Sequence, residues 1–178
     1  MQESCDNLNH MNYYKIGEDF EDFIVRALYA RLPGKINIIQ NKSIWSFALN
    51  KKTQIDMILI TEFGIYCIEA KRYRTKIKGS INDKIWFGFS GSYMTRFYNP
   101  YFQNVEHIRC LKRELRKQGY VVPQIRNYVC IPNKCDSETD IARVVTLGTL
   151  LTRLERDAIR NTKRLDVEMI SKMINRIN

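Results

Sequence analysis

The sequence predicts an α/β fold in which a mixed β-sheet is flanked by helices, with further helices at the C-terminal end. Residues 55–71 form two apolar runs joined by a short Gly-containing turn, which is typical of a β-hairpin. Both faces of that hairpin are apolar, so a sheet that contains it needs a covering layer on each side. Helical patterns of apolar residues precede and follow the hairpin, at 15–32 and 103–119.

Length and composition indicate a single domain. The chain has 178 residues, 44% hydrophobic and 27% charged, which is ordinary for a globular protein. Residues 1–14 are a polar lead-in without the pattern of a secretory signal, and we expect one domain over residues 15–178. No run of 18 apolar residues occurs, so we expect no membrane span.

Charge and cysteine usage narrow the expected partners and compartment. The net charge of +10 favours an anionic partner, with nucleic acid first among the candidates. The five cysteines are odd in number and form no CxxC pair, which predicts a reducing, cytoplasmic setting. Cys67 and Cys110 fall in apolar runs, where a thiol serves as a small core residue.

The first element is a helix from residue 15 that Pro33-Gly34 ends. Its buried stripe is expected to contain the apolar residues at three- and four-residue steps: Phe20, Phe23, Ile24, Ala27, Leu28 and Leu32. Acidic residues crowd its first turns, where they favour the helix dipole. One of them, Glu21, is a step from the stripe, so it either serves the dipole or points toward the hairpin.

Residues 35–41 and 44–49 predict either two strand segments or one bent strand, and the hairpin follows. If its turn is centred between Glu62 and Phe63, Asp56 lies directly opposite Glu69, with Cβ atoms about 4.5–5.5 Å apart. Lys71 shares the face of Glu69 because side chains repeat every two residues. A bulge at Gly64 would shift this register by one residue.

This cluster of two carboxylates and a lysine suits metal-assisted chemistry. Opposed carboxylates in apolar strands repel each other, and a divalent cation relieves the repulsion. Oxygen ligands suit Mg²⁺, and a neighbouring lysine can orient or deprotonate an attacking water and offset phosphate charge. The alternative is that Asp56 and Glu69 lie at strand ends in water, where Lys71 pairs with one of them.

Residues 72–98 alternate basic and aromatic side chains, with glycines at 79, 88 and 91 that suggest a hairpin and turns. The alternating residues are Arg72, Tyr73, Arg74, Lys76, Lys78, Trp86, Phe87, Phe89, Tyr93, Arg96, Phe97 and Tyr98. Two interpretations stay open. The segment either binds a strand of nucleic acid, with phosphates on the cations and bases on the rings, or forms a short antiparallel edge whose aromatics pack inward.

After Asn99-Pro100 breaks the chain, residues 103–119 predict a helix that Gly119 caps. Its buried stripe is expected to be Val105, Ile108, Leu111 and Leu115, and its outer face is basic. Gln103 and His107 share a face, and a lone histidine beside a stripe is more often a satisfied core or surface residue than a catalyst. Since the chain has two histidines, a His-rich metal site is excluded.

The last third of the chain alternates strands and helices. Residues 125–131 predict a strand, 132–140 a polar loop and 144–147 a final short strand. Residues 149–159 and 166–177 predict two closing helices, the second with Asp166 as its N-cap.

Taken in order, these residues resemble the nuclease-related domain (NERD) of the PD-(D/E)xK nuclease superfamily. The resemblance covers roughly residues 15–131. The segments that carry it are Gly17-(x3)-Glu21, Thr53-Gln54-Ile55-Asp56, Phe63-Gly64-Ile65-Tyr66, Ile68-Glu69-Ala70-Lys71, Trp86 after a Gly-containing turn, and Asn99-Pro100-(x2)-Gln103-Asn104-(x2)-His107.

The resemblance implies a restriction-endonuclease-like core and Mg²⁺-dependent (or Mn²⁺-dependent) cleavage of nucleic-acid phosphodiesters. Asp56 and Glu69 would be metal ligands, and Glu21 would contact the metal directly or through water. Lys71 would orient the water and stabilise the pentavalent phosphate, while Gln54 would position the metal or the lysine.

Two positions depart from the family pattern: Met57 stands where the family often has His, and no proline precedes Asp56. Neither removes a metal ligand. The residues expected to contact nucleic acid or support its binding are Arg72, Arg74, Lys76, Lys78, Gln103, Asn104 and His107.

The predicted function is therefore that of a metal-dependent nuclease, an endonuclease or exonuclease with DNA as the first expected substrate. Two alternatives are open: a nucleic-acid-binding module that keeps the fold but cuts poorly, and a regulatory domain whose basic face meets an acidic partner. A homodimer is compatible with the sequence, because cleaving both strands of a duplex commonly needs two sites.

Overall fold

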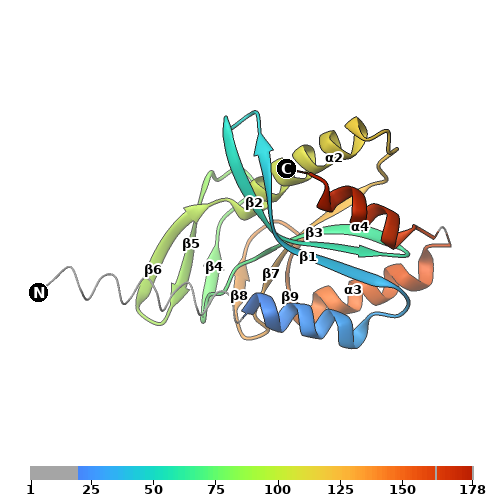
Figure 1. Cartoon of the computed structure of the whole chain (residues 1–178). Helices are drawn as coiled ribbons and strands as arrows, with labels where there is room; N and C mark the ends of the chain where they lie inside the picture. The colour runs from blue at the N-terminus through green and yellow to red at the C-terminus, as the bar shows by residue number, and fades with distance from the viewer. Residues whose placement is uncertain (1–19, 163, 178) are drawn as a thin grey trace, which may run out of the picture.

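The computed structural model describes residues 20–162 and 164–177, and it has the predicted α/β architecture (Figure 1). The expected lead-in 1–14 and the start of the first helix at residues 15–19 lie outside the described residues. Within them, a five-stranded sheet has helices on both faces, and a four-stranded sheet stands beside it.

The larger sheet has the strand order β1-β2-β3-β7-β9. Its strands are β1 (Ile36–Ser46), β2 (Lys51–Thr61), β3 (Gly64–Ala70), β7 (Ile125–Ile131) and β9 (Val144–Thr146). The first three strands are antiparallel neighbours, and β3, β7 and β9 run parallel, so the sheet is mixed. Of the two alternatives for residues 35–49, the single strand is correct.

The segment after β3 builds the second sheet, in the order β6-β5-β4-β8. Its strands are β4 (Lys76–Lys78), β5 (Ile85–Ser90), β6 (Tyr93–Tyr98) and β8 (Asp136–Glu138). β8 lies within residues 132–140, which the sequence predicts as a loop. That prediction is wrong because β8 is polar and exposed, and only its pairing with β4, some 60 residues earlier, makes it a strand.

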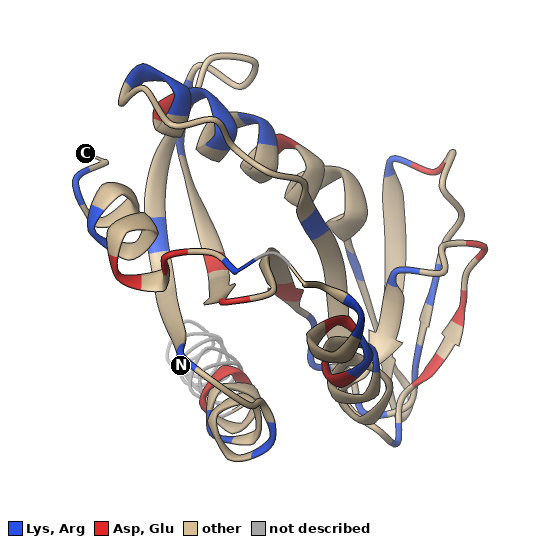
Figure 2. Ribbon diagram, turned by 90° about the vertical axis from the view of Figure 1, so that its right-hand side faces the viewer, with Lys and Arg blue, Asp and Glu red and all other residues tan. Residues whose placement is uncertain are grey.

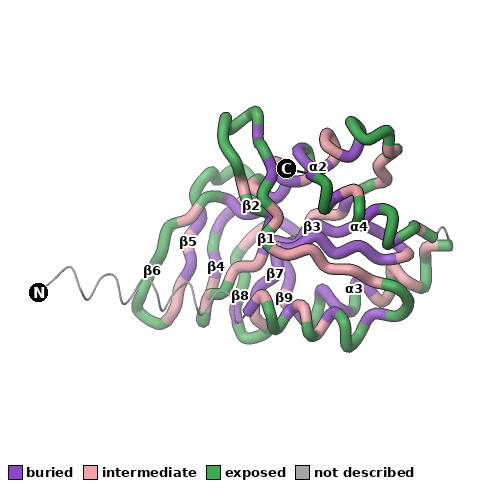
Figure 3. The backbone as a smooth tube through the Cα atoms, in the orientation of Figure 1, coloured by how far each residue is buried: buried purple, intermediate pink, exposed green. Residues whose placement is uncertain are grey.

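Two helices cover each face of the larger sheet. The first helix, described over residues 20–31, and α3 (Leu147–Arg160) pack on the face that carries Met57, Leu59, Tyr66 and Ile68. α2 (Pro100–Lys117) and α4 (Val167–Asn175) pack on the other face, against Ile58, Ile60, Ile65 and Cys67. The central strands are consequently buried along most of their length (Figure 3).

β2 bends at Asp56. Ile58 and Ile60 face α2 and α4, as period-two alternation requires, but Ile55 joins the same core cluster although it is three residues from Ile58. The facing position in β1 is Asn41, between the pairs Gln40–Met57 and Lys42–Ile55, and its φ of 53° lies in the left-handed region. Asparagine tolerates that conformation better than most residues, so the bend has a local cause.

Two predicted core positions are wrong. Val105 is 43% exposed because the buried face of α2 is rotated toward Asn104, His107 and Cys110, two of which make polar contacts with the sheet. Phe23 is 52% exposed because it lies at the edge of the stripe, beside an open hollow.

Other local predictions are confirmed. Asp166 caps α4, accepting from the Met169 N–H at 2.9 Å. Gly119 follows α2 with a φ of 77° and donates to Arg116 O. Cys67 and Cys110 are buried free thiols, while the cytoplasmic setting stays a prediction. None of the helices within residues 20–162 and 164–177 has the length and apolar character needed to cross a membrane.

Candidate active site

The β2–β3 hairpin has the predicted register. Met57 pairs with Ile68 and Thr61 with Gly64, so no bulge shifts the described hairpin, and one further step in this register would set Asp56 opposite Glu69. Met57–Ile68 is the last backbone pair of this ladder. Beyond it the Ala70 N–H donates to Asp56 Oδ2 at 2.9 Å, and the Lys71 N–H donates to Cys130 O of β7. The Asp56 side chain thus replaces a backbone acceptor at the point where the two strands part.

Glu69 is buried, with 1% exposure. Burial raises its pKa to about 7. The positive charge of Lys71 opposes that rise, and the nearby carboxylates of Asp56 and Glu21 add to it. Burial likewise raises the pKa of Asp56, against Lys71 and the Ala70 N–H. The site therefore concentrates negative charge that the surrounding protein only partly compensates.

Lys71 supplies the nearest positive charge. Its Nζ lies 2.7 Å from Glu69 Oε1, and 22% of its side chain is exposed. Burial by itself lowers the pKa of this amine, but Glu69 and Asp56 outweigh burial and leave the pKa raised. Lys71 is therefore a cation at neutral pH.

His107 completes the cluster from α2. Its ring is 1% exposed, with Nε2 2.9 Å from Thr53 Oγ1 and Nδ1 3.8 Å from Glu69 Oε2. Burial, followed by the charge of Lys71, lowers its pKa to about 4, so the imidazole is neutral at pH 7. Sequence reasoning missed Thr53 as its partner, since the two are 54 residues apart and no local pattern links them.

Unsatisfied polar atoms gather here. Among the buried side-chain nitrogen and oxygen atoms of the described residues, Glu69 Oε2 and His107 Nδ1 have no hydrogen-bond partner. The ammonium of Lys71, 2.7 Å from Glu69 Oε1, is the partner of that oxygen. Each such orphan in a folded protein needs an explanation.

Glu21 and Gln54 lie at different distances from this centre. Glu21, half-buried on the first helix, is near enough to raise the pKa of Glu69, as expected of an acid pointing toward the hairpin. Gln54 is exposed, and its Nε2 donates to Asn41 Oδ1 at 2.8 Å across the bend of β2.

Asn104 and His107 are interior residues, so neither side chain presents a surface that nucleic acid can reach. Asn104 is 0% exposed, and its Nδ2 donates to Cys67 O and Asn127 Oδ1, both at 2.8 Å, and to Tyr128 O at 3.2 Å. It thereby joins α2 to β3 and β7. The burial of these two side chains does not fit the prediction that they contact nucleic acid. Gln103 is half-buried beside them.

The basic residues that follow Lys71 separate into two groups. Arg72 and Arg74 are exposed on the connection to β4. Lys76 and Lys78 lie on the outer face of the second sheet, where Glu138 pairs with them at 2.7 and 3.4 Å. The aromatic residues of this segment also separate into packed and exposed ones. Trp86 is fully buried and Tyr73 stacks on Phe97, whereas Tyr93 is 72% exposed.

Comparison with known proteins agrees with the geometry. The family model described as "Nuclease-related domain" matches residues 16–132. An uncharacterized protein of Bacillus anthracis is 28% identical over 102 residues, which cover 57% of this chain and 48% of the relative. The matched region thus spans about half the length of that curated relative. No solved structure matches the chain.

Proposed function

Because the chain belongs to the nuclease-related domain family, whose model matches well over half of it, we propose that it is a metal-dependent nuclease that hydrolyses nucleic-acid phosphodiesters, with DNA as the expected substrate. Family membership supports a nuclease-related function. The metal requirement, the catalytic activity and the preference for DNA are our inference from the side chains at the end of the β2–β3 ladder.

The observation that carries the proposal is the Glu69 carboxylate. It is 1% exposed, lies near enough to Asp56 for that carboxylate to raise its pKa, and its Oε2 has no hydrogen-bond donor among the described residues. A carboxylate in that environment is costly unless a cation binds it. Lys71 answers only part of that need, because it contacts one of the two oxygens.

The donor chemistry fits a hard divalent cation. Asp56 and Glu69 present carboxylate oxygens, which Mg²⁺ and Mn²⁺ prefer, and Glu21 is the third acid nearby. Among the described residues no group of three or more His, Cys, Asp or Glu side chains is preassembled around one point. Two carboxylates suffice for Mg²⁺, which usually keeps water and substrate phosphate oxygens as its other ligands. When bound, the metal would offset phosphate charge and acidify a bound water.

Lys71 has the role of an electrostatic group in this proposal. Since the two acids keep its amine protonated at neutral pH, it is a poor base and a good partner for a phosphate oxygen. Its 22% exposed side chain provides access to substrate. We infer that Lys71 orients the attacking water and stabilises charge on the pentavalent phosphate.

The remaining residues have supporting roles. Glu21 would contact a bound metal directly or through water, and Gln54 would help to position the metal or Lys71 from the bend of β2. Among the basic residues after β3, Arg72 and Arg74 are the better candidates for phosphate contacts, because both are exposed on the segment that directly follows Lys71.

A cleavage assay tests the proposal. Plasmid, duplex, single-stranded DNA and RNA are incubated with the protein and Mg²⁺, Mn²⁺ or EDTA. Cleavage products are expected with Mg²⁺ or Mn²⁺ but not with EDTA. Asp56→Asn and Lys71→Ala are expected to lower the rate at least about 100-fold, the scale for one preorganised catalytic group. Lys84→Ala removes an exposed lysine before β5 and serves as the matched control.

Two results would support the alternatives instead. Salt-sensitive binding without cleavage under either metal indicates a nucleic-acid-binding module that keeps the fold. Absence of binding at low salt indicates a regulatory domain whose basic surface meets an acidic protein. Sedimentation of the same samples tests whether a homodimer forms.

A further inference from the structure

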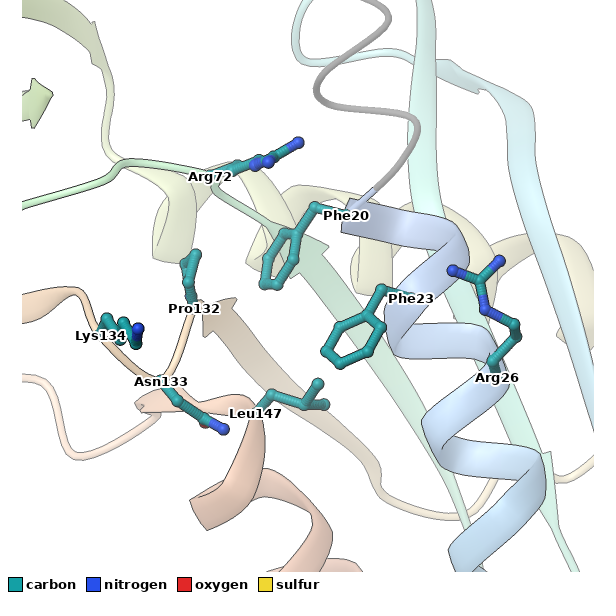
Figure 4. A pocket seen from close by; sticks show the side chains of 8 residues that line it. All are labelled: Phe20, Phe23, Arg26, Arg72, Pro132, Asn133, Lys134 and Leu147. Atoms are coloured by element: carbon teal, nitrogen blue, oxygen red, sulfur yellow. The ribbon is translucent and has the colours of Figure 1, made fainter.

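A hollow of about 370 Å³ opens between the first helix and the ends of β3 and β7 (Figure 4). The rings of Phe20 and Phe23 point toward its centre, with Pro132 and Leu147 opposite them, and the charged side chains stand around the rim. Its lining residues are Phe20, Phe23, Arg26, Arg72, Pro132, Asn133, Lys134 and Leu147.

The hollow borders the candidate active site. Phe20 precedes Glu21 on the first helix, and Arg72 follows Lys71 directly after β3. Residues 132–134 follow the end of β7, which runs parallel to β3. The first helix, which carries Glu21, and the segment after β3, which begins at Lys71, therefore also line the hollow. They do so at the carboxyl ends of β3 and β7.

Its floor is apolar and anchored in the core. Phe20 and Leu147 are 7% and 3% exposed and belong to the core cluster under the first helix. Phe23 is different, because it continues the helical stripe in sequence yet leaves half of its ring open to the hollow. An aromatic ring held open beside a fixed apolar floor is suited to stacking with a planar ligand.

The charges around the floor are of one sign. Arg26, Arg72 and Lys134 lie among the lining residues, and none of the described residues that line the hollow is acidic. Neither Arg26 nor Lys134 has an ion-pair partner within residues 20–162 and 164–177, and both are exposed. Positive charges clustered around a low-dielectric apolar surface raise the local concentration of anions.

We propose that this hollow binds one unpaired nucleotide beside the phosphodiester that Asp56, Glu69 and Lys71 act on, so the preferred substrate is a single strand or a frayed end. The proposal rests on the function proposed above and adds the substrate class. The base stacks on Phe23, and the adjoining phosphates contact Lys134, Arg72 and Arg26. A base inside a duplex has both faces covered by its neighbours and cannot use the ring.

The hollow also has the right size for this ligand. Its volume falls within the roughly 300–1,000 Å³ of sites that enclose small molecules, and its mixture of apolar floor and few polar groups is typical of them. An apolar peptide could also cover the floor, but it would leave Arg26 and Lys134 without an ion-pair partner among the described residues. Charge therefore favours the nucleotide.

The test measures binding in EDTA, where cleavage does not interfere. The full chain is titrated into a fluorescein-labelled single-stranded oligonucleotide with one 2-aminopurine, and into the same sequence as a blunt duplex. Phe23→Ala is expected to weaken single-strand binding about tenfold, the effect of losing one stacked base, and to abolish quenching of 2-aminopurine. The duplex affinity is expected to change less than twofold.

Matched controls are available on the same surfaces. Tyr29 lies on the same helix and is 52% exposed, as Phe23 is, so Tyr29→Ala is expected to leave single-strand binding unchanged. Lys134→Ala is expected to weaken it several-fold, whereas Lys84→Ala, which removes an exposed lysine before β5, is not. Melting curves followed by circular dichroism show whether each variant is folded.

Distinct outcomes separate the two proposals. If Phe23→Ala and Tyr29→Ala behave alike, or if the duplex loses as much affinity as the single strand, the nucleotide site is wrong even where cleavage is observed. If Phe23→Ala weakens single-strand binding but no metal supports cleavage, the site stands and the nuclease proposal fails. A change in self-association on gel filtration with unchanged binding would show that the hollow serves a protein contact, which also overturns the nucleotide site.

Discussion

Asn104 and His107 lie one helical turn apart on α2 and occupy buried positions that apolar residues would ordinarily fill. Their roles differ. Asn104 uses its hydrogen bonds within the fold, whereas His107 leaves Nδ1 without a partner beside Glu69. A satisfied buried polar group fixes structure, and an unsatisfied one beside a charged cluster indicates chemistry.

Replacing Asn104 with Ala is expected to lower the free energy of unfolding by about 2–3 kcal/mol, because Cys67 O, Tyr128 O and Asn127 Oδ1 lose a donor in the interior. Urea denaturation measures this loss. Gln103→Ala on the same helix, at a half-buried position, is the control and is expected to cost less than about 0.5 kcal/mol. Unchanged stability with a selective loss of nucleic-acid binding would contradict the structural role.

Thr53 offers a second prediction at this scale. Its hydroxyl lies 2.9 Å from His107 Nε2 and so holds the ring beside Glu69. Thr53→Val keeps the shape but removes the hydroxyl, and we expect Mn²⁺ affinity to fall at least about tenfold, as when other groups that orient metal-site side chains are lost. Isothermal titration measures the affinity. Thr53→Ser is expected to retain it, and equal affinities in Val and Ser variants would show that the hydroxyl orients nothing.

At the scale of elements, Asn99 joins the second sheet to α2. It is 0% exposed, and its Oδ1 accepts from the Tyr101 N–H at 3.0 Å while its Nδ2 donates to Asp83 O at 2.9 Å. One side chain thereby caps the helix that carries His107 and fixes the loop before β5.

Asn99→Ala is therefore expected to cost about 2 kcal/mol, since it removes both the cap and a buried donor. Thermal and urea unfolding measure the change. Asp166, the N-cap of α4, accepts from Met169 at an exposed position, and Asp166→Ala is expected to cost about 1 kcal/mol. Equal losses in the two variants would show that the bond to Asp83 O contributes nothing.

What the sequence could predict depended on how far apart the interacting residues are. The register of the β2–β3 hairpin follows from counting across a short turn, and the structure has it from Met57–Ile68 to Thr61–Gly64. The rotated face of α2 did not follow, because Asn104 and His107 contact residues 23 to 54 positions away. The strand β8 was missed for the same reason, as its three polar residues acquire structure through β4.

At the scale of the whole molecule, the positive charges differ in whether acidic side chains pair with them. Figure 2 shows Lys and Arg along α2, at the top of the view, as well as on the strands and loops. On α2, Arg109 pairs with Glu106, and Arg113 and Lys117 pair with Glu114. The basic outer face that periodicity predicts is thus partly neutralised by acids on the same helix.

The contribution of basic residues on α2 to substrate binding also depends on their distance from the candidate active site. Arg116 is nine residues beyond His107, which corresponds to about 14 Å along a helix at ~1.5 Å per residue. Charges separated by more than the Debye length of about 8 Å at physiological salt are largely screened. Arg116 and Lys117 should accordingly contribute little to a substrate held at the carboxyl ends of β3 and β7, whereas Arg72 and Lys134 line the hollow at those ends.

We therefore expect two double variants with the same change in net charge to behave differently. Arg72→Ala with Lys134→Ala should reduce the slope of log Kd against log salt for a single-stranded oligonucleotide by about 1–2, because two phosphate contacts are lost. Arg116→Ala with Lys117→Ala should leave the slope nearly unchanged. Anisotropy titrations in EDTA between 50 and 200 mM NaCl cover the range in which such slopes are measured. Equal reductions in the two variants would mean that binding follows the net charge of +10 and that the hollow holds no phosphate.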